Sequence, residues 1–254
     1  MVPSLFLAHG SPMIAIETTA YTTYLAELGK TLAPKAIVIF TAHWESETVT
    51  ISSTDDTYET IYDFGGFPPE MYRLTYPAKG SAEVASKVER LLAEHGIPSR
   101  LNASRGLDHG SWTLLLRLFP KADIPVVQVS VNPYLPMERQ FEIGQALNSL
   151  GAENILVIGS GATVHNLRML SMKPEVEPWA VAFDDWLIEH MQMRDYEALA
   201  QVMERAPSAK LAVPRPEHFV PLYIAMGAGS PDGEVKLLHR SYELGSLSYL
   251  AVQF

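Results

Sequence analysis

The chain alternates short apolar runs with longer segments in which apolar residues recur every three or four positions. The short runs are rich in β-branched residues and end at turn residues, which predicts buried strands at 5–8, 36–41, 126–131 and 155–158. Further strands are expected at 48–53 and 249–254. The periodic segments predict helices at 18–30, 81–95, 111–119, 137–150, 178–191, 195–204 and 217–226.

Strands that alternate with helices predict an α/β fold, in which helices flank a central sheet that is largely parallel or mixed. The chain has no internal repeat and no low-complexity linker, and its 254 residues can bury a sizeable core. We therefore expect a single domain over residues 1–254. The longest irregular stretch, 58–80, is too apolar and aromatic for a solvated linker, and long ordered loops are usually functional.

Composition narrows the function classes. The chain carries 19 basic and 29 acidic side chains, and this formal charge of −10 argues against a nucleic-acid partner. It has no apolar run of 18 residues and no basic leader before an apolar stretch, so we expect a cytoplasmic protein with no membrane partner. The absence of cysteine excludes disulfides and thiolate chemistry, so any metal would be held by His, Asp, Glu or backbone oxygen.

Five of the 8 histidines stand in positions typical of a functional site. In open α/β sheets the ligand crevice lies beyond the carboxyl ends of the strands. His9 and His43 follow the first two predicted strands, and His165 comes shortly after the strand at 155–158. His218 is expected to open a helix, and His109 stands in a glycine-flanked loop. Neutral imidazole is a common ligand of zinc and iron, so a metal site is one interpretation of this set.

The spacing alone does not assign roles to these five histidines. It leaves open which of them bind a metal, which transfer protons and which are structural. The remaining three, His95, His190 and His239, stand at helix ends or in a polar-flanked strand, where a structural role is expected.

Seven blocks in a fixed order span nearly the whole chain: FLAHGSPM at 6–13, TAHW at 41–44, DFGGFP at 63–68, GLDHGSW at 106–112, VHNLR at 164–168, PEHFVPL at 216–222 and GSLS at 245–248. In these blocks the sequence resembles the class III extradiol ring-cleavage dioxygenases, in the branch of the 4,5-DOPA dioxygenase extradiol type. The resemblance implies an oxidoreductase that uses O2 and a non-haem metal to open a catechol ring, such as that of a DOPA-like compound, beside its two hydroxyls.

The resemblance also implies roles for the histidines. His9, His43 and His218 match the metal ligands, although many members of the wider superfamily have Glu at the third position and Glu217 is adjacent. His165 matches an active-site base that could also be a fourth ligand, and His109 matches a second histidine of the substrate pocket. The metal implied for catalysis is Fe(II), and the same imidazoles would also hold Zn(II).

Other residues of these blocks are candidates for substrate binding. The aromatic residues Trp44, Phe64, Phe67, Tyr72 and Trp112 could wall a pocket for the ring. Arg168 or Arg215 could pair with a substrate carboxylate, and Asp108 or Asn166 could orient a histidine. The expected assembly is a monomer or a small homo-oligomer.

Two other functions compete with the dioxygenase. A zinc-dependent hydrolase could use the same ligands, because zinc-activated water needs neither O2 nor a redox metal. A non-catalytic member of the superfamily would keep the fold and bind a partner. The presence of all five histidines argues against the second alternative.

Overall fold

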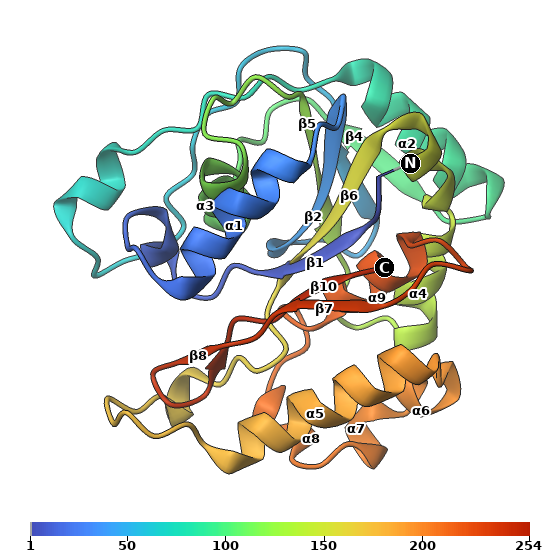
Figure 1. Cartoon of the computed structure of the whole chain (residues 1–254). Coiled ribbons are helices and arrows are strands. Elements are labelled where there is room, and N and C mark those ends of the chain that lie inside the picture. The colour runs from blue at the N-terminus through green and yellow to red at the C-terminus, as the bar shows by residue number, and fades with distance from the viewer. Residues whose placement is uncertain (1) are drawn as a thin grey trace.

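Figure 1 shows the computed structural model of the chain, which describes residues 2–254. Its centre is a mixed sheet of eight strands in the order β4-β3-β5-β2-β6-β1-β10-β7. The strands are β1 (Leu5–Ala8), β2 (Ala36–Glu45), β3 (Val49–Ser52), β4 (Ser99–Asn102), β5 (Val126–Val131), β6 (Ile155–Gly161), β7 (Lys236–His239) and β10 (Ala251–Gln253). The small strands β8 (Tyr242–Glu243) and β9 (Leu247–Ser248) pair separately. The predicted α/β fold with a central mixed sheet is confirmed.

The four central strands β5, β2, β6 and β1 run parallel to one another. The antiparallel pairs lie toward the edges, where β10 joins β1, β7 joins β10, and β3 joins β5. Both faces of the central strands are covered: Leu5 and Leu7 enter one core, and Phe6 enters another. This burial on both faces explains why the central strands appear in the sequence as continuous apolar runs.

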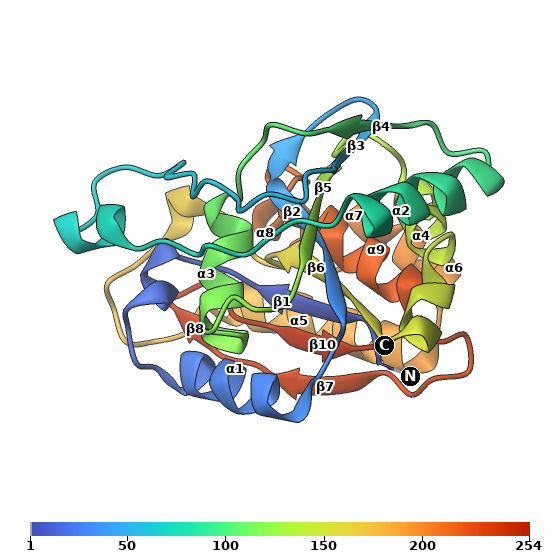
Figure 2. The same ribbon diagram turned by 90° about the horizontal axis from the view of Figure 1, so that it is seen from above.

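Helices cover both faces of the sheet (Figure 2). On one face lie α1 (Ala20–Thr31) and α3 (His109–Leu118); on the other lie α2 (Ala82–Glu94), α4 (Met137–Gln145) and α9 (Val220–Ala228). The helices α5 (Pro178–Met193), α6 (Tyr196–Ala200), α7 (Val202–Arg205) and α8 (Ala209–Ala212) pack beside α9 and β1. Short 3₁₀ helices are η1 (Pro12–Ala15), η2 (Pro69–Arg73), η3 (Asn148–Glu153) and η4 (Leu167–Met169). Within residues 2–254, none of the helices combines the length and the apolar character that a membrane crossing requires.

Three element boundaries differ from the sequence predictions, and each difference changes where a candidate histidine lies relative to a strand or helix. Strand β2 continues past its apolar run to Glu45, which pairs with Val131 after a register shift, so His43 lies within the strand. Helix α3 begins at His109 rather than after it. Helix α9 begins at Val220, so His218 precedes it. Proline lacks a backbone N–H and is tolerated in the first turn, which explains a helix start beside Pro221.

Two predicted helices are interrupted. The segment 137–150 forms α4 only to Gln145, and η3 follows; the segment 195–204 is divided between α6 and α7. The apolar periodicity continues across both breaks, and the elements on either side of each break remain packed on the same core: α6 contacts α5, and η3 contacts α9. Periodicity therefore located the buried positions correctly and the helix ends incorrectly.

Candidate functional site

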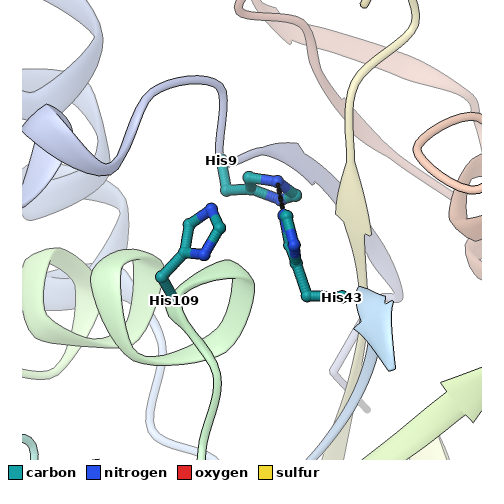
Figure 3. A group of neighbouring side chains, drawn as sticks. All are labelled: His9, His43 and His109. Carbon is teal, nitrogen blue, oxygen red and sulfur yellow. Dashed lines mark hydrogen bonds between the residues drawn. The ribbon is translucent and has the colours of Figure 1, made fainter. Parts of the chain in front are cut away.

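Three imidazoles converge where β1, β2 and β6 end. The Nε2 atom of His43 lies 3.0 Å from Nε2 of His9 and 3.2 Å from Nε2 of His218. The centroids of the three rings are 4.9 to 5.0 Å apart. Figure 3 shows His9, from the turn after β1, and His43, from β2, facing each other. His9 and His218 are buried and His43 is partly buried, so the three nitrogens meet away from bulk water.

The backbone around each imidazole is fixed locally. Gly10 has φ +52, and a Cβ there would lie 2.4 Å from the Tyr249 ring, so the turn after His9 requires glycine. A Cβ on Gly161 would lie 2.0 Å from the carbonyl oxygen of His218, and that oxygen accepts a hydrogen bond from Ala162 N–H at 2.8 Å. The chain before α9 therefore packs directly against the end of β6.

Hydrogen bonds determine which nitrogen of His9 carries the proton. Ser160 Oγ donates its only hydrogen to the carbonyl oxygen of Gly110, and Nδ1 of His9 lies 2.9 Å from the same Oγ. Because the serine hydrogen is already used, His9 Nδ1–H must be the donor. The lone pair of His9 is therefore on Nε2, facing the other two imidazoles.

Carboxylates impose the same protonation on the other two imidazoles. Nδ1 of His218 donates to Oε1 of Glu217 at 3.0 Å, and Nδ1 of His43 lies 3.4 Å from Oδ2 of Asp63. The Glu217 oxygen accepts from His218 Nδ1–H, and the negative charge of Asp63 beside His43 Nδ1 favours the proton on that nitrogen, so Nε2 is left free in both rings. Three Nε2 lone pairs therefore point into one small volume.

The electrostatics of the site keep these imidazoles neutral. Burial is the main cause that lowers the pKa of His9, His43 and His218, and the neighbouring histidines lower it further; the pKa of His43 falls to about 2. The pKa of Asp63 also falls to about 2, because hydrogen bonds and charge interactions with His109, together with His43, outweigh the burial that raises it.

The donor set fits a metal ion. Neutral imidazoles with inward lone pairs are the form in which histidine binds metals. Two nitrogens bound to one ion at roughly 2.0–2.1 Å are about 3 Å apart when their bonds are near a right angle. The Nε2 separations of 3.0 and 3.2 Å correspond to that spacing.

The other two histidines flank this triad. His109 begins α3, its ring centroid lies 3.8 Å from that of His43, and Figure 3 shows it facing the same space. Its Nδ1 and its backbone nitrogen each lie 2.9 Å from Oδ1 of Asp63, so one carboxylate contacts two histidines. His165 stacks on His218 with centroids 3.6 Å apart and planes at 11°. Burial lowers the pKa of His165 as well.

A cavity of about 450 Å³ opens onto the histidines, a size typical of small-molecule sites. His43, His109, His165 and His218 line its floor, and His9, whose Nε2 lies 3.0 Å from that of His43, completes the floor without lining the cavity. The ring of Phe64 meets that of His109 edge to face at 5.6 Å, and Phe67 packs against Phe64. The remaining walls are mostly apolar and come from turns and from the short elements η1, η4 and β9: Gly10, Ser11, Pro12, Gly65, Leu167, Leu170, Leu244 and Leu247.

Of the predicted substrate-binding residues, Phe64 and Phe67 line this cavity, and Trp44, Tyr72, Trp112 and Arg168 do not. Trp112 is fully buried and its indole Nε1–H donates to the carbonyl oxygen of Ile61 at 3.0 Å, so it supports the wall from behind. The Trp44 ring lies under the Arg105 guanidinium. Tyr72 packs against Phe64 but outside the lining.

The two arginines expected to bind a carboxylate are placed differently from that expectation. Arg168 is exposed and its side chain is outside the cavity lining. Arg215 makes two hydrogen bonds to Glu45, at 2.8 and 2.6 Å, so its guanidinium is already paired.

The groups that orient the histidines differ from those predicted from the sequence. Asp108 accepts from Thr41 Oγ1 at 2.7 Å and Asn166 donates to the carbonyl oxygen of Leu211 at 2.8 Å, so neither contacts a histidine side chain through these bonds. Ser160, Asp63 and Glu217 have that role instead. The sequence prediction considers Glu217 only as an alternative metal ligand. Its position next to His218 is the feature of the sequence that indicates an orienting role.

Comparisons with known proteins agree with this geometry. Residues 3–252 match the family described as the catalytic LigB subunit of aromatic ring-opening dioxygenase. The chain is 39% identical to a protein of Beta vulgaris named 4,5-DOPA dioxygenase extradiol, over 99% of this chain and 96% of that one. It is 38% identical to a protein of the same name from Escherichia coli, over 99% of this chain and 94% of that one.

A solved structure has the same architecture. An uncharacterized protein from Escherichia coli K12 superposes with a TM-score of 0.86 at 33% sequence identity, and the match covers 100% of both chains. The fold, the family match and the relatives together identify this chain as a member of the family of the catalytic LigB subunit of aromatic ring-opening dioxygenases.

Proposed function

We propose that this protein is an extradiol dioxygenase that opens a catechol ring with O2 at a divalent non-haem metal held by His9, His43 and His218. The observation that carries this proposal is the convergence of three Nε2 lone pairs at the floor of a cavity large enough for an aromatic ring. Membership of the family and the names of the relatives support the reaction class.

The metal proposed for catalysis is Fe(II). When bound, iron would supply the redox chemistry with O2 that ring opening needs, whereas zinc would occupy the same imidazoles without it. The protein's own contribution is to keep the three ligands neutral and oriented, through Ser160, Asp63 and Glu217.

His165 is proposed as the base rather than as a fourth ligand. An imidazole binds a metal through a lone pair in the plane of its ring, and the planes of His165 and His218 are nearly parallel and stacked. The stacked His165 ring would therefore leave the metal to His9, His43 and His218 and would be available for proton transfer. Burial lowers the pKa of His165 below 6.5, so at neutral pH it can accept the proton of a catechol hydroxyl.

His109 and the phenylalanines are proposed to position the ring. Asp63 holds the His109 ring against the floor, where its imidazole can hydrogen-bond a bound hydroxyl. Phe64 and Phe67 offer flat apolar surfaces on the side of the cavity next to His109.

The decisive experiment loads metal-free protein with Fe(II) without oxygen, adds a panel of catechols, and then admits air. The proposal expects one O2 consumed per catechol and a coloured ring-opened product, and it expects no O2 uptake from the zinc-loaded protein. Absence of uptake with every catechol by fully iron-loaded protein would overturn it. Turnover that continues without O2 and with zinc would instead identify a hydrolase.

A further inference from the structure

We propose that the catechol taken by this site carries an apolar, uncharged substituent rather than an ionised amino-acid or carboxylate side chain. This inference rests on the proposed function and concerns the part of the substrate that points away from the histidines. The structural basis is a wall of leucine and phenylalanine side chains between the histidine floor and solvent.

The lining of the cavity offers no charged partner apart from the histidines. Among its residues, all within the described part of the chain, there is no lysine, arginine, aspartate or glutamate. Among the lining residues other than the histidines, Ser11 has the only polar side chain; its hydroxyl accepts the backbone N–H of Met13 as the cap of η1 and carries no charge. A substituent that extends toward solvent would therefore contact Leu167, Leu170, Leu244 and Leu247.

Two of the four leucines at the mouth are exposed, and the backbone that carries them is hydrogen-bonded. Leu167 is 61% exposed and Leu244 is 37% exposed, although both are large apolar side chains. Ser171 N–H donates to the carbonyl oxygen of Leu244, and Glu177 N–H donates to that of Gly245, each at 2.8 Å. These bonds fix the segment after η4 against the β8–β9 turn. Exposed apolar side chains fixed around a cavity are typical of a binding site for an apolar group.

The arginines nearest the floor are paired within the protein. Arg105 Nη2 donates to the carbonyl oxygen of His43 at 3.1 Å and to Asp108 at 3.3 Å, and Arg215 pairs with Glu45. Directly behind the histidines stand the carboxylates of Asp63 and Glu217. A substrate carboxylate would thus lose its water without gaining a cation, which is unfavourable in an apolar cavity. A substrate ammonium would find no carboxylate in the lining, because Asp63 and Glu217 stand behind the imidazoles.

The test measures equilibrium binding to zinc-loaded protein without oxygen, so that turnover plays no part. The ligands are catechol, propylcatechol, dihydrocaffeate and the methyl ester of dihydrocaffeate, which keeps the shape of the acid and removes its charge. Each buried methylene should lower Kd about fourfold. The ester should bind roughly tenfold or more tightly than the acid. An acid that binds as tightly as its ester would overturn the proposal.

Two matched variants localise the effect. Leu167→Lys places a cation at the mouth and should strengthen dihydrocaffeate binding while it weakens propylcatechol binding. Leu237→Lys changes a leucine of similar type, 42% exposed in β7 and outside the cavity lining, and should alter neither. If Leu167→Lys leaves both affinities at their original values, the substituent does not reach the leucines and the proposal fails.

A third variant tests whether Arg168, which is exposed and follows Leu167 in the sequence, reaches the substrate. Arg168→Gln should leave the preference for the ester over the acid unchanged. If it instead weakens dihydrocaffeate binding about tenfold or more, the arginine reaches the substrate and the proposal is overturned. The outcomes also separate the two proposals: catechols that bind and consume O2 but favour the acid refute only this inference, whereas no O2 uptake from any of them refutes the dioxygenase itself.

Discussion

At the floor of the cavity, each of the three converging imidazoles has a polar partner behind it: Ser160, Asp63 or Glu217. At the mouth, side chains such as Leu167 and Leu244 have no polar group to direct them, and only the backbone behind them is hydrogen-bonded. The floor therefore fixes protonation states and directions, whereas the mouth fixes shape and polarity. Under the two proposals, the floor would determine the reaction and the mouth would determine the choice of substrate.

The largest effect should come from removing a ligand at the floor. His43→Ala is expected to lower metal content from about one ion per chain to near zero and to abolish O2 uptake, because loss of a direct ligand should cost more than the roughly 10–100-fold typical of an outer partner. Metal analysis of protein purified without oxygen measures this. His95→Ala, at the exposed end of α2, is the matched control and should keep its metal. Full metal content in His43→Ala would exclude the proposed site.

His165→Gln should separate proton transfer from metal binding. It is expected to lower kcat by roughly 10²–10⁴ while the metal content stays at that of the unaltered protein, because a base is lost and no ligand is. Steady-state O2 uptake and metal analysis of the same sample are the two measurements. A loss of activity that simply follows a loss of metal would make His165 a ligand.

Asp63→Asn should weaken metal binding without removing a proposed ligand. Asp63 contacts both His43 and His109, so the amide is expected to reduce metal affinity by roughly 10–100-fold. Competition with a chelator of known affinity gives the value. Asp56→Asn, on the exposed part of the preceding segment, should have no effect on metal affinity.

Leu170→Ala at the mouth should leave metal affinity unchanged but weaken propylcatechol binding. Equal effects on metal affinity and on propylcatechol binding would contradict the division between floor and mouth.

The smallest expected effect is a change in how stability depends on pH. Burial lowers the pKa of His43 from 6.5 to about 2, so below pH 6.5 the unfolded chain binds a proton there that the folded, metal-free chain does not. The contribution of neutral His43 is therefore complete above pH 6.5 and is lost as the pH falls, at roughly 1.4 kcal/mol per pH unit.

His43→Gln should make the pH dependence of unfolding less steep by that amount, as measured by urea unfolding of metal-free protein between pH 7 and pH 5. Leu170→Ala should lower the free energy of unfolding by an amount that does not change with pH. An unchanged slope in His43→Gln would mean that His43 is not held neutral.

Much of the fold followed from local pattern. The strands at 5–8 and 126–131 coincide with β1 and β5, because both of their faces are buried and the run is uninterrupted. Strand β4 (Ser99–Asn102) escaped prediction because it is polar and lies at the edge of the sheet, where only its pairing with β3 defines it. The prediction ended at Thr41 and missed the last residues of β2, 42–45, because they include the polar residues His43 and Glu45.

The histidines of the site were predictable and their partners were not. Each histidine stands in a recognisable block at a strand or helix end, which a single sequence displays. Asp63, by contrast, meets the backbone of His109 across 46 residues, and Ser160 meets His9 across 151. Such contacts depend on which loop ends beside which strand. The leucines of the mouth were missed for the same reason. They come from two segments far apart in the sequence, around η4 and around the β8–β9 turn, that backbone hydrogen bonds bring together.

The order in which the chain is made has a consequence at the floor. His43 lies 34 residues after His9, but His218 lies 175 residues after His43. The third imidazole therefore emerges from the ribosome only when β1, β2 and β6 have all been synthesised. An ion that needs all three nitrogens cannot nucleate the sheet, and contacts so distant in sequence form late in folding. Under the proposed function, metal capture would be the last step of maturation, and a chain truncated before His218 would carry only two of the three imidazoles.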